Sequence, residues 1–223
     1  PRKTKAALVA CALDPVGGDW NNGSAPAVHH IPNNHAGWGR LDMSGLLESQ
    51  TQSFCIDQTQ VLTQSSAQYS IDVQVDQAGQ PLKIVLAWTD PPAALNAQQA
   101  LVNDLDLTVT HEGQQWLGNV FEEGQSVTGG AADRLNNLEC VFLNAAQAGQ
   151  YTLTVSAHRL DGDALTDQGE DFEQDFALYA RNVLDQSAKG RVQLDRSLYR
   201  AQDEVVIHLS DHDLRGTGRL SVQ

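Results

Sequence analysis

The chain has 223 residues, of which 41% are hydrophobic and 19% charged, so its composition is that of a folded protein and not of a disordered one. Its 28 acidic and 14 basic residues give a formal net charge of −14, which repels the phosphates of nucleic acid and anionic membranes. From this charge we expect no nucleic acid partner. Because no apolar run approaches about 20 residues, we also expect no membrane span.

The N-terminal segment predicts two short helices joined by a long connection. Residues 1–13 (PRKTKAALVACAL) are Ala-rich, with apolar side chains at helical spacing. Residues 14–36 are rich in Asp, Gly, Asn, Pro and His, which indicates an irregular loop. A short helix is then predicted, with Asp42 or Ser44 placed to cap it. These pieces are too small to bury a core, so we expect residues 1–47 to pack on the rest of the chain or on a neighbouring copy.

From about residue 50 the apolar period changes to two, which predicts β-strands. Residues 69–76 alternate apolar and polar side chains, whereas residues 81–89 (PLKIVLAWT) are apolar on both faces, as in a central strand. Further strands are predicted at residues 103–110, 138–143, 150–158 and 176–183. Many short strands with polar turns and no long helix predict an all-β fold, an antiparallel β-sandwich or jelly roll. Residues after about 185 look like the start of a further β module.

Several motifs, in this order along the chain, resemble one protein family. The family's catalytic domain ends in segments that resemble KAALVACA, GWGRLD and LLES. The β-sandwich that follows it in some bacterial members resembles PLKIVLAWTDPP, LVNDLDLTVT, a WLGN turn, DRLNNLECVFLN and AGQYTLTVSAH. The family is that of the subtilisin-like serine proteases (subtilases), and this sandwich is similar to the P-domain of kexin-like proprotein convertases. The tail resembles the Ig-like repeats of large secreted subtilases.

The resemblance implies a division into three parts and a role for each. Residues 1–49 would be the end of a catalytic domain, residues 50–184 a P-domain-like sandwich, and residues 185–223 the start of an Ig-like module. Since the chain opens at Pro1, not Met, we expect a fragment or a processed product. It would be an accessory part of a secreted or cell-envelope endopeptidase, with the catalytic domain of the same polypeptide as its partner. The alternative is a module that binds a polysaccharide or a protein substrate.

Protease activity is not expected of this chain. The family's catalytic Asp, His and Ser precede the segment matched here, and the Gly-Thr-Ser nucleophile motif does not occur. Ser24 lies in a loop without Gly-Thr before it. A triad needs a nucleophile, a base and an orienting group within hydrogen-bond reach, and no segment supplies that set.

The strongest local pattern predicts a calcium site. Alternation along a strand places Asp104 and Asp106 on one face, where two carboxylates repel each other unless they are solvated or bridged by a cation. Ca²⁺ takes six to eight oxygen ligands, and the candidate set is Asp90, Asn103, Asp104, Asp106 and Asp133. Calcium in this sandwich is also what the resemblance implies. The alternative is a solvated polar face on which Asp104 caps a turn.

The remaining candidates each have a structural alternative. His29, His30 and His35 can hold a metal ion or be exposed loop residues. Trp88 and Trp116 can form a sugar-stacking platform, although core packing is expected of Trp88, and Trp38 is expected in the seam beside the catalytic domain. The acidic stretch 161–175 is expected to be a solvated loop. At most one disulfide can form among Cys11, Cys55 and Cys140.

Overall fold

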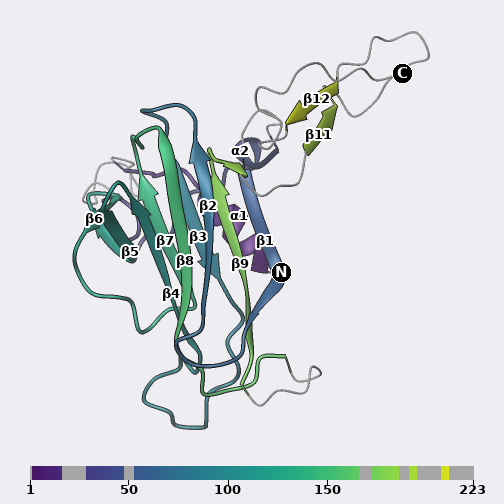
Figure 1. The fold of residues 1–223 in the computed structure, drawn as a ribbon. Helices are drawn as coiled ribbons and strands as arrows, with labels where there is room; N and C mark the ends of the chain where they lie inside the picture. Colours follow the sequence, from purple (N-terminus) through teal and green to yellow (C-terminus); the bar gives the residue numbers. More distant parts are fainter. Residues whose placement is uncertain are drawn as a thin grey trace. The chain divides into compact units, whose positions relative to one another are not determined.

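The computed structural model describes residues 2–16, 29–47, 53–165, 172–185, 191–194 and 207–210, and these are mostly β-strand (Figure 1). The chain divides into two compact units, Pro1–Asp185 and Gln186–Gln223. The second unit contains an antiparallel pair, β11 (Arg191–Leu194) and β12 (Ile207–Ser210). Among the described residues no helix has both the length and the apolar character needed to cross a membrane.

In its described residues, the first unit is a sandwich of two antiparallel sheets with two short helices. The helices are α1 (Arg2–Cys11) and α2 (Met43–Leu47). The four-stranded sheet has the order β1 (Ser53–Leu62), β9 (Gln174–Arg181), β3 (Leu82–Ala87), β7 (Leu138–Leu143). The six-stranded sheet has the order β10 (Leu184–Asp185), β2 (Gln68–Val75), β8 (Gly149–Arg159), β4 (Asp104–His111), β5 (Gln114–Glu122), β6 (Gln125–Thr128). The predicted all-β sandwich is thus confirmed.

The main core lies between the two sheets and follows from the period of two. Leu105, Leu107 and Val109 of β4 are fully buried on its inner face. Ile84 and Leu86 of β3 belong to the same buried cluster from the opposite sheet. Each of these side chains is worth about 1.5–3 kcal/mol of burial, so this cluster supplies most of the apolar stabilisation of the sandwich.

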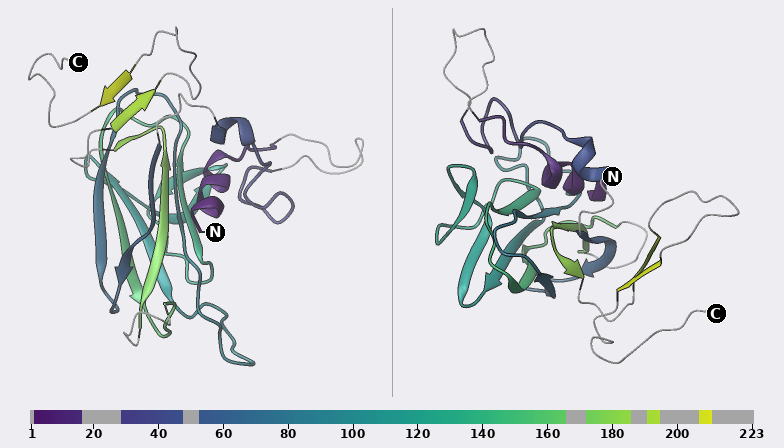
Figure 2. Two further views of the ribbon diagram at one scale, coloured as in Figure 1. Left: turned by 90° about the vertical axis from the view of Figure 1, so that its right-hand side faces the viewer. Right: turned by 90° about the horizontal axis from the view of Figure 1, so that it is seen from above.

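A second apolar cluster lies on the outer face of the four-stranded sheet, where α1 packs (Figure 2). Ala6 and Ala10 of α1 are fully buried there, against a cluster that includes Val85 and Phe142 of the sheet. Small side chains on the buried stripe of α1 let the helix backbone approach the sheet closely. Helix α1 contacts β9, β3 and β1, so the N-terminal segment and the sandwich share this second cluster.

The connection between α1 and α2 is fixed at three described points. Leu13 and Arg40 exchange backbone hydrogen bonds of 2.9 Å in both directions. The Asp42 carboxylate accepts a hydrogen bond from the Ser44 amide at 3.2 Å, so Asp42 caps α2, as the sequence predicts. Trp38 packs edge-on against Phe121 and Phe142, with ring centroids 5.9 and 6.2 Å away. Trp38 therefore lies between the N-terminal segment and the sandwich.

Strands β1, β5 and β6 are absent from the sequence predictions, and the WLGN segment is wrongly predicted as a turn. Trp116 to Asn119 lie inside β5, whose pairing with β6 shifts register between Trp116 and Phe121. Asn119 has a positive φ of 62°, and Gly118 leaves room for the Glu139 carboxyl, which a Cβ would meet at 2.2 Å. The irregular backbone at Gly118 and Asn119, which interrupts the alternating pattern of β5, therefore allows β5 to contact Glu139 of β7.

Candidate functional site

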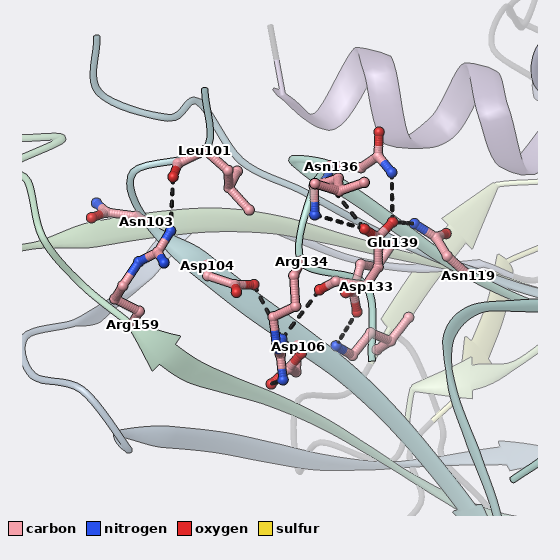
Figure 3. Close-up of polar contacts among 12 residues, drawn as sticks. Leu101, Asn103, Asp104, Asp106, Asn119, Asp133, Arg134, Asn136, Glu139 and Arg159 are labelled. Atoms are coloured by element: carbon pink, nitrogen blue, oxygen red, sulfur yellow. Dashed lines mark hydrogen bonds and ion pairs between the residues drawn. The ribbon is translucent and has the colours of Figure 1, made fainter. Parts of the chain in front are cut away.

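The predicted cation site lies around the first half of β4 (Figure 3). Strand β4 pairs with β8 from Asp104 to Thr110 but with β5 only from Thr108 to His111. The first half of β4 therefore has an edge without a strand partner. Asp104 and Asp106 stand on this half, and the segment before β7 brings Asp133 and Arg134 to it.

Arg134 holds the Asp104–Asp106 pair. Its Nη1 donates to Oδ1 of Asp106 and lies 3.3 Å from Oδ1 of Asp104, while its Nη2 lies 3.3 Å from Oδ2 of Asp106. The Asp106 hydrogen bond raises the pKa of Arg134 above its ordinary value. Desolvation raises the pKa of Asp104, although Arg134 opposes this shift, and Oδ2 of Asp104 is buried without a partner. A guanidinium thus supplies the positive charge that the sequence assigned to calcium.

Asp133 belongs to a neighbouring network of caps and amides. Its Oδ1 accepts from the Leu135 amide at 2.8 Å, and its Oδ2 accepts from the side-chain amides of Asn119 and Asn136, each at 2.6 Å. Desolvation alone would raise the pKa of Asp133, but these hydrogen bonds outweigh it and lower the pKa. Both oxygens of Asp133 are therefore committed to shaping the turn before β7.

Asn103 and Asp90 form a third network, on the other side of β4's first residue. Asp90 accepts hydrogen bonds from the backbone amides of Val102 and Asn103 at 2.8 and 2.7 Å. The buried Asn103 side chain donates to the Gly162 carbonyl and to Gln174, and its Oδ1 accepts from the amides of residues 161 and 162. Asn103 therefore ties three chain segments together, and its side-chain oxygen is already bonded.

Glu139 of β7 is the group that sequence reasoning missed. Its Oε2 accepts a hydrogen bond of 2.5 Å from the Leu107 amide, which β5 leaves without a strand partner. Its Oε1 is buried with no hydrogen-bond partner. The pKa of Glu139 is raised to about 9, mainly by desolvation. The hydrogen bond from Leu107 lowers this pKa, whereas the charges of Asp106 and Asp133 raise it further. Glu139 is therefore a neutral acid at pH 7. Its hydrogen bond with Leu107 joins β7 of the four-stranded sheet to β4 of the six-stranded sheet.

The five predicted calcium ligands do not converge on one point. They fall into the three networks just described, and Arg134 stands beside the Asp104–Asp106 pair where the ion would bind. Among the described residues, no group of three or more His, Cys, Asp or Glu side chains is placed to hold a metal ion. A calcium ion on these carboxylates would require Arg134 to leave, so the donor set as arranged does not fit the ion.

The other candidate residues have structural surroundings. His29 and His35 are exposed, and Nδ1 of His30 is 2.6 Å from Oδ2 of Asp14. Trp88 is 1% exposed and donates its Nε1 hydrogen to the Asn103 carbonyl, as expected of a core residue, and Trp116 is also buried. All three cysteines are free thiols.

Two further predictions fall partly or wholly outside the described residues. Ser24 lies in residues 17–28, outside them. In the acidic stretch 161–175, residues 166–171 are also outside. The prediction of a solvated loop is wrong for Glu173 and Asp175, which are buried at the entry to β9. Arg2 of α1 pairs with Asp175, which explains how a carboxylate is kept there.

Comparison with known proteins gives one partial likeness. No family model matches the chain. A segment of 75 residues, 32% of the chain, is 35% identical to the serine protease/ABC transporter B family protein tagB of Dictyostelium discoideum. The match covers 4% of that protein, so the chain spans only a small part of its length. This links the chain to a protein named as a serine protease, without showing which family the chain belongs to.

Proposed function

We propose that this chain is a non-catalytic accessory part of a subtilisin-like serine endopeptidase. Residues 1–49 would be the end of the catalytic domain, and the sandwich would stabilise that domain from its C-terminal side. The order of the subtilase-like motifs and the partial likeness to a protein named as a serine protease support this proposal. A secreted or cell-envelope location of the whole protein is part of the same proposal.

The observation that carries the proposal is the shared core of the N-terminal segment and the sandwich. Helix α1 covers the outer face of the four-stranded sheet, and Trp38 packs on Phe121 and Phe142 beside it. A helix that ended a catalytic domain in this position would bind the sandwich rigidly to that domain. Stabilisation then follows, because anything that binds only the folded state shifts the folding equilibrium towards it.

The outward face of the N-terminal segment supports the same proposal. Its large apolar side chains that are exposed in this chain are Leu13, Val16, Leu41, Met43 and Leu47. Met43 and Leu47 lie on α2, and the other three lie in the connection between α1 and α2. This is the segment that would be part of the catalytic domain. Apolar groups gathered on one segment are typical of a surface that another body covers.

The test uses the longer polypeptide in which a catalytic domain precedes this chain. Leu41→Asp and Leu47→Asp should shorten the half-life of proteolytic activity at elevated temperature severalfold, because each places a charge in the proposed contact. Leu95→Asp is the matched control, since Leu95 is 96% exposed in a loop of the sandwich. Both Leu41 and Leu47 are exposed here, so the same substitutions should leave unfolding of the isolated chain unchanged. Equal half-lives for all three variants would refute the contact.

The isolated chain is proposed to lack protease activity. It should release no peptides from casein at high protein concentration. Cleavage that a serine-directed inhibitor abolishes would contradict the proposal, and so would a longer polypeptide that is equally active and stable without residues 50–223.

Calcium remains a prediction of the sequence, and Arg134 defines its test. If calcium binds, it stabilises the folded chain by about 2.7 kcal/mol at a hundredfold excess over Kd, and Arg134→Ala should strengthen that effect by freeing both carboxylates. The measurement is the melting temperature of parent and variant in millimolar Ca²⁺ and in EDTA. A parent melting temperature that does not differ between the two solutions removes calcium from the proposal.

A further inference from the structure

A hollow of about 200 Å³ lies at the end of β4 opposite the acidic residues. Its walls come from the β4–β5 hairpin, the start of β6 and the turn between β7 and β8. The hollow is not part of the face covered by α1. Neither the subtilase resemblance nor the proposed accessory role assigns anything to it.

Three rings line the wall of this hollow. The His111 imidazole stacks on the Tyr151 ring, with centroids 4.1 Å apart and planes 7° from parallel. The Trp116 indole lies beyond Tyr151 at 6.5 Å. Aromatic faces of this kind pack against the apolar faces of ligand rings.

His111 has a buried, unpaired ring nitrogen. Its Nδ1 is 2.8 Å from the Gln150 carbonyl, which only accepts, so Nδ1 carries a hydrogen. Nε2 is buried without a hydrogen-bond partner, and the His111 side chain is 3% exposed. The nearest carboxylate oxygen, of Glu112, is 4.0 Å away, beyond hydrogen-bond distance. Because Nε2 is buried, the His111 ring supports the wall through its Gln150 hydrogen bond and its stack on Tyr151 and does not bond a ligand directly.

The rim of the hollow is made of carboxamides. The residues that provide them are Gln114, Gln125, Asn144 and Gln147, and all four are exposed. A carboxamide both donates and accepts hydrogen bonds, as a sugar hydroxyl does. None of the described residues that line the hollow is Lys, Arg, Asp or Glu, and the net charge of −14 repels anions. These groups favour a neutral ligand rich in hydroxyl groups.

Hydrogen bonds hold the turn between β7 and β8 in place. The Tyr151 hydroxyl accepts from the Gln147 amide at 3.1 Å and donates to the Gln147 carbonyl at 3.2 Å. The Ala146 amide donates to the Gln80 carbonyl at 3.0 Å, and its carbonyl accepts from the Gly79 amide at 2.8 Å. A preformed wall costs a ligand little ordering on binding.

We infer that this hollow binds one neutral sugar ring, seated between the wall that contains Trp116 and Tyr151 and the exposed carboxamide rim, which hydrogen-bonds the hydroxyl groups of the sugar. The inference is independent of the accessory role, because it concerns a different face and needs no protease. It gives the polysaccharide-binding alternative a specific site. The platform of Trp88 and Trp116 that the sequence suggested is not available for stacking, because both rings are buried.

The test titrates the 223-residue chain with D-glucose, D-galactose or N-acetyl-D-glucosamine at millimolar concentrations. Proton NMR follows the His111 ring and the Trp116 indole, each assigned by substitution. At least one sugar should shift both signals saturably. The paired variant Gln125→Ala/Asn144→Ala removes two exposed amides without touching the core, and it should weaken binding by about tenfold, or about 1.4 kcal/mol. Gln115→Ala is the matched control, because Gln115 is an exposed neighbour on β5 that does not line the hollow.

Three outcomes would overturn the inference. One is the absence of any shift with all three sugars. A second is equal binding by the parent and the paired variant, or an equal loss in the Gln115→Ala control. The third is glucuronate binding as tightly as glucose, because the hollow contains no cation to hold its carboxylate. None of these outcomes bears on the half-life test of the accessory role.

Discussion

The two sheets of the sandwich differ in what their outer faces carry. On the outer face of the four-stranded sheet, Val85, Cys140 and Phe142 are buried in the cluster that this sheet shares with the N-terminal segment. On the outer face of the six-stranded sheet, Asp72 of β2 accepts hydrogen bonds from Gln150 and Thr152 of β8, each at 2.6 Å, and Ser70 pairs with Thr154 at 2.9 Å. One face is apolar and covered, and the other is a polar ladder open to solvent.

The two outer faces have different requirements in water. An antiparallel sheet with one polar face is sufficient for a sandwich that stands alone in water. An apolar outer face instead requires a permanent cover, and here the cover is the N-terminal segment. This supports the proposal that the sandwich joins the rest of a larger protein through its four-stranded sheet.

The largest effect is expected from removing a large side chain beneath the cover. Phe142→Ala should lower the free energy of unfolding by about 3–5 kcal/mol, because Phe142 is 1% exposed and packs against Trp38 and Phe121. Thr110→Ala, on the outer face of the six-stranded sheet, is the control and should change it by less than about 0.5 kcal/mol. Urea unfolding measures both. Similar losses for the two variants would mean that the outer faces do not differ in the way described.

A slightly smaller effect is expected where α1 is held by charge. Arg2 pairs with the buried Asp175 and donates its Nε hydrogen to the Thr89 hydroxyl at 2.8 Å. Arg2→Ala should cost about 3 kcal/mol, because it leaves a buried carboxylate without its partner. The exposed Lys3 on the same helix turn gives the control Lys3→Ala, with little expected change. If both variants unfold at the parent's urea concentration, the ion pair does not anchor α1.

Glu139, where the two sheets meet, should make stability depend on pH. Its folded pKa of about 9 lies above the ordinary value of 4.5, so between these values the folded chain holds a proton that the unfolded chain has lost. The resulting stabilisation is complete below pH 4.5 and is lost as the pH rises towards 9. Between pH 6 and pH 8 the loss is at most about 2.7 kcal/mol, from about 1.36 kcal/mol for each pH unit.

Glu139→Gln isolates this contribution. Gln keeps a side-chain oxygen for the Leu107 amide but does not ionise, so the variant should lose less stability than the parent between pH 6 and pH 8. Urea unfolding at a series of pH values compares the two slopes. Parallel curves for parent and variant would show that Glu139 does not carry the raised pKa.

The sequence predicted the fold where side-chain periodicity carried the information. Alternation in residues 103–110 and the doubly apolar run 81–89 located β4 and β3, and of the two predicted helix caps, Asp42 and Ser44, the structure selects Asp42. Strand β5 escaped prediction because Gly118 and the positive φ of Asn119 interrupt its pattern.

For the candidate site, the sequence predicted the carboxylates but not their partners. Asp104 and Asp106 do share one side of β4, as alternation requires. Arg134 was not predicted beside them, because the pairing spans 28 residues and depends on the turn before β7. Glu139 stood in an apolar run with no sign that its oxygen would replace a missing strand partner at Leu107. Long-range charge pairing of this kind is set by the tertiary fold.

The smallest effect is expected at the outward face of the cover. Leu47 is 75% exposed on α2, and with Leu41 and Met43 it leaves apolar surface open when this chain is alone. The isolated chain should therefore self-associate weakly, giving an average mass above 24.2 kDa that rises with concentration in sedimentation equilibrium. Leu47→Asp should return the mass to that of a monomer, whereas Leu95→Asp should not. A parent that stays monomeric at high concentration would mean that this surface is too small or too scattered to bind another body, and the contact with a catalytic domain would then have to rest on residues buried in this chain.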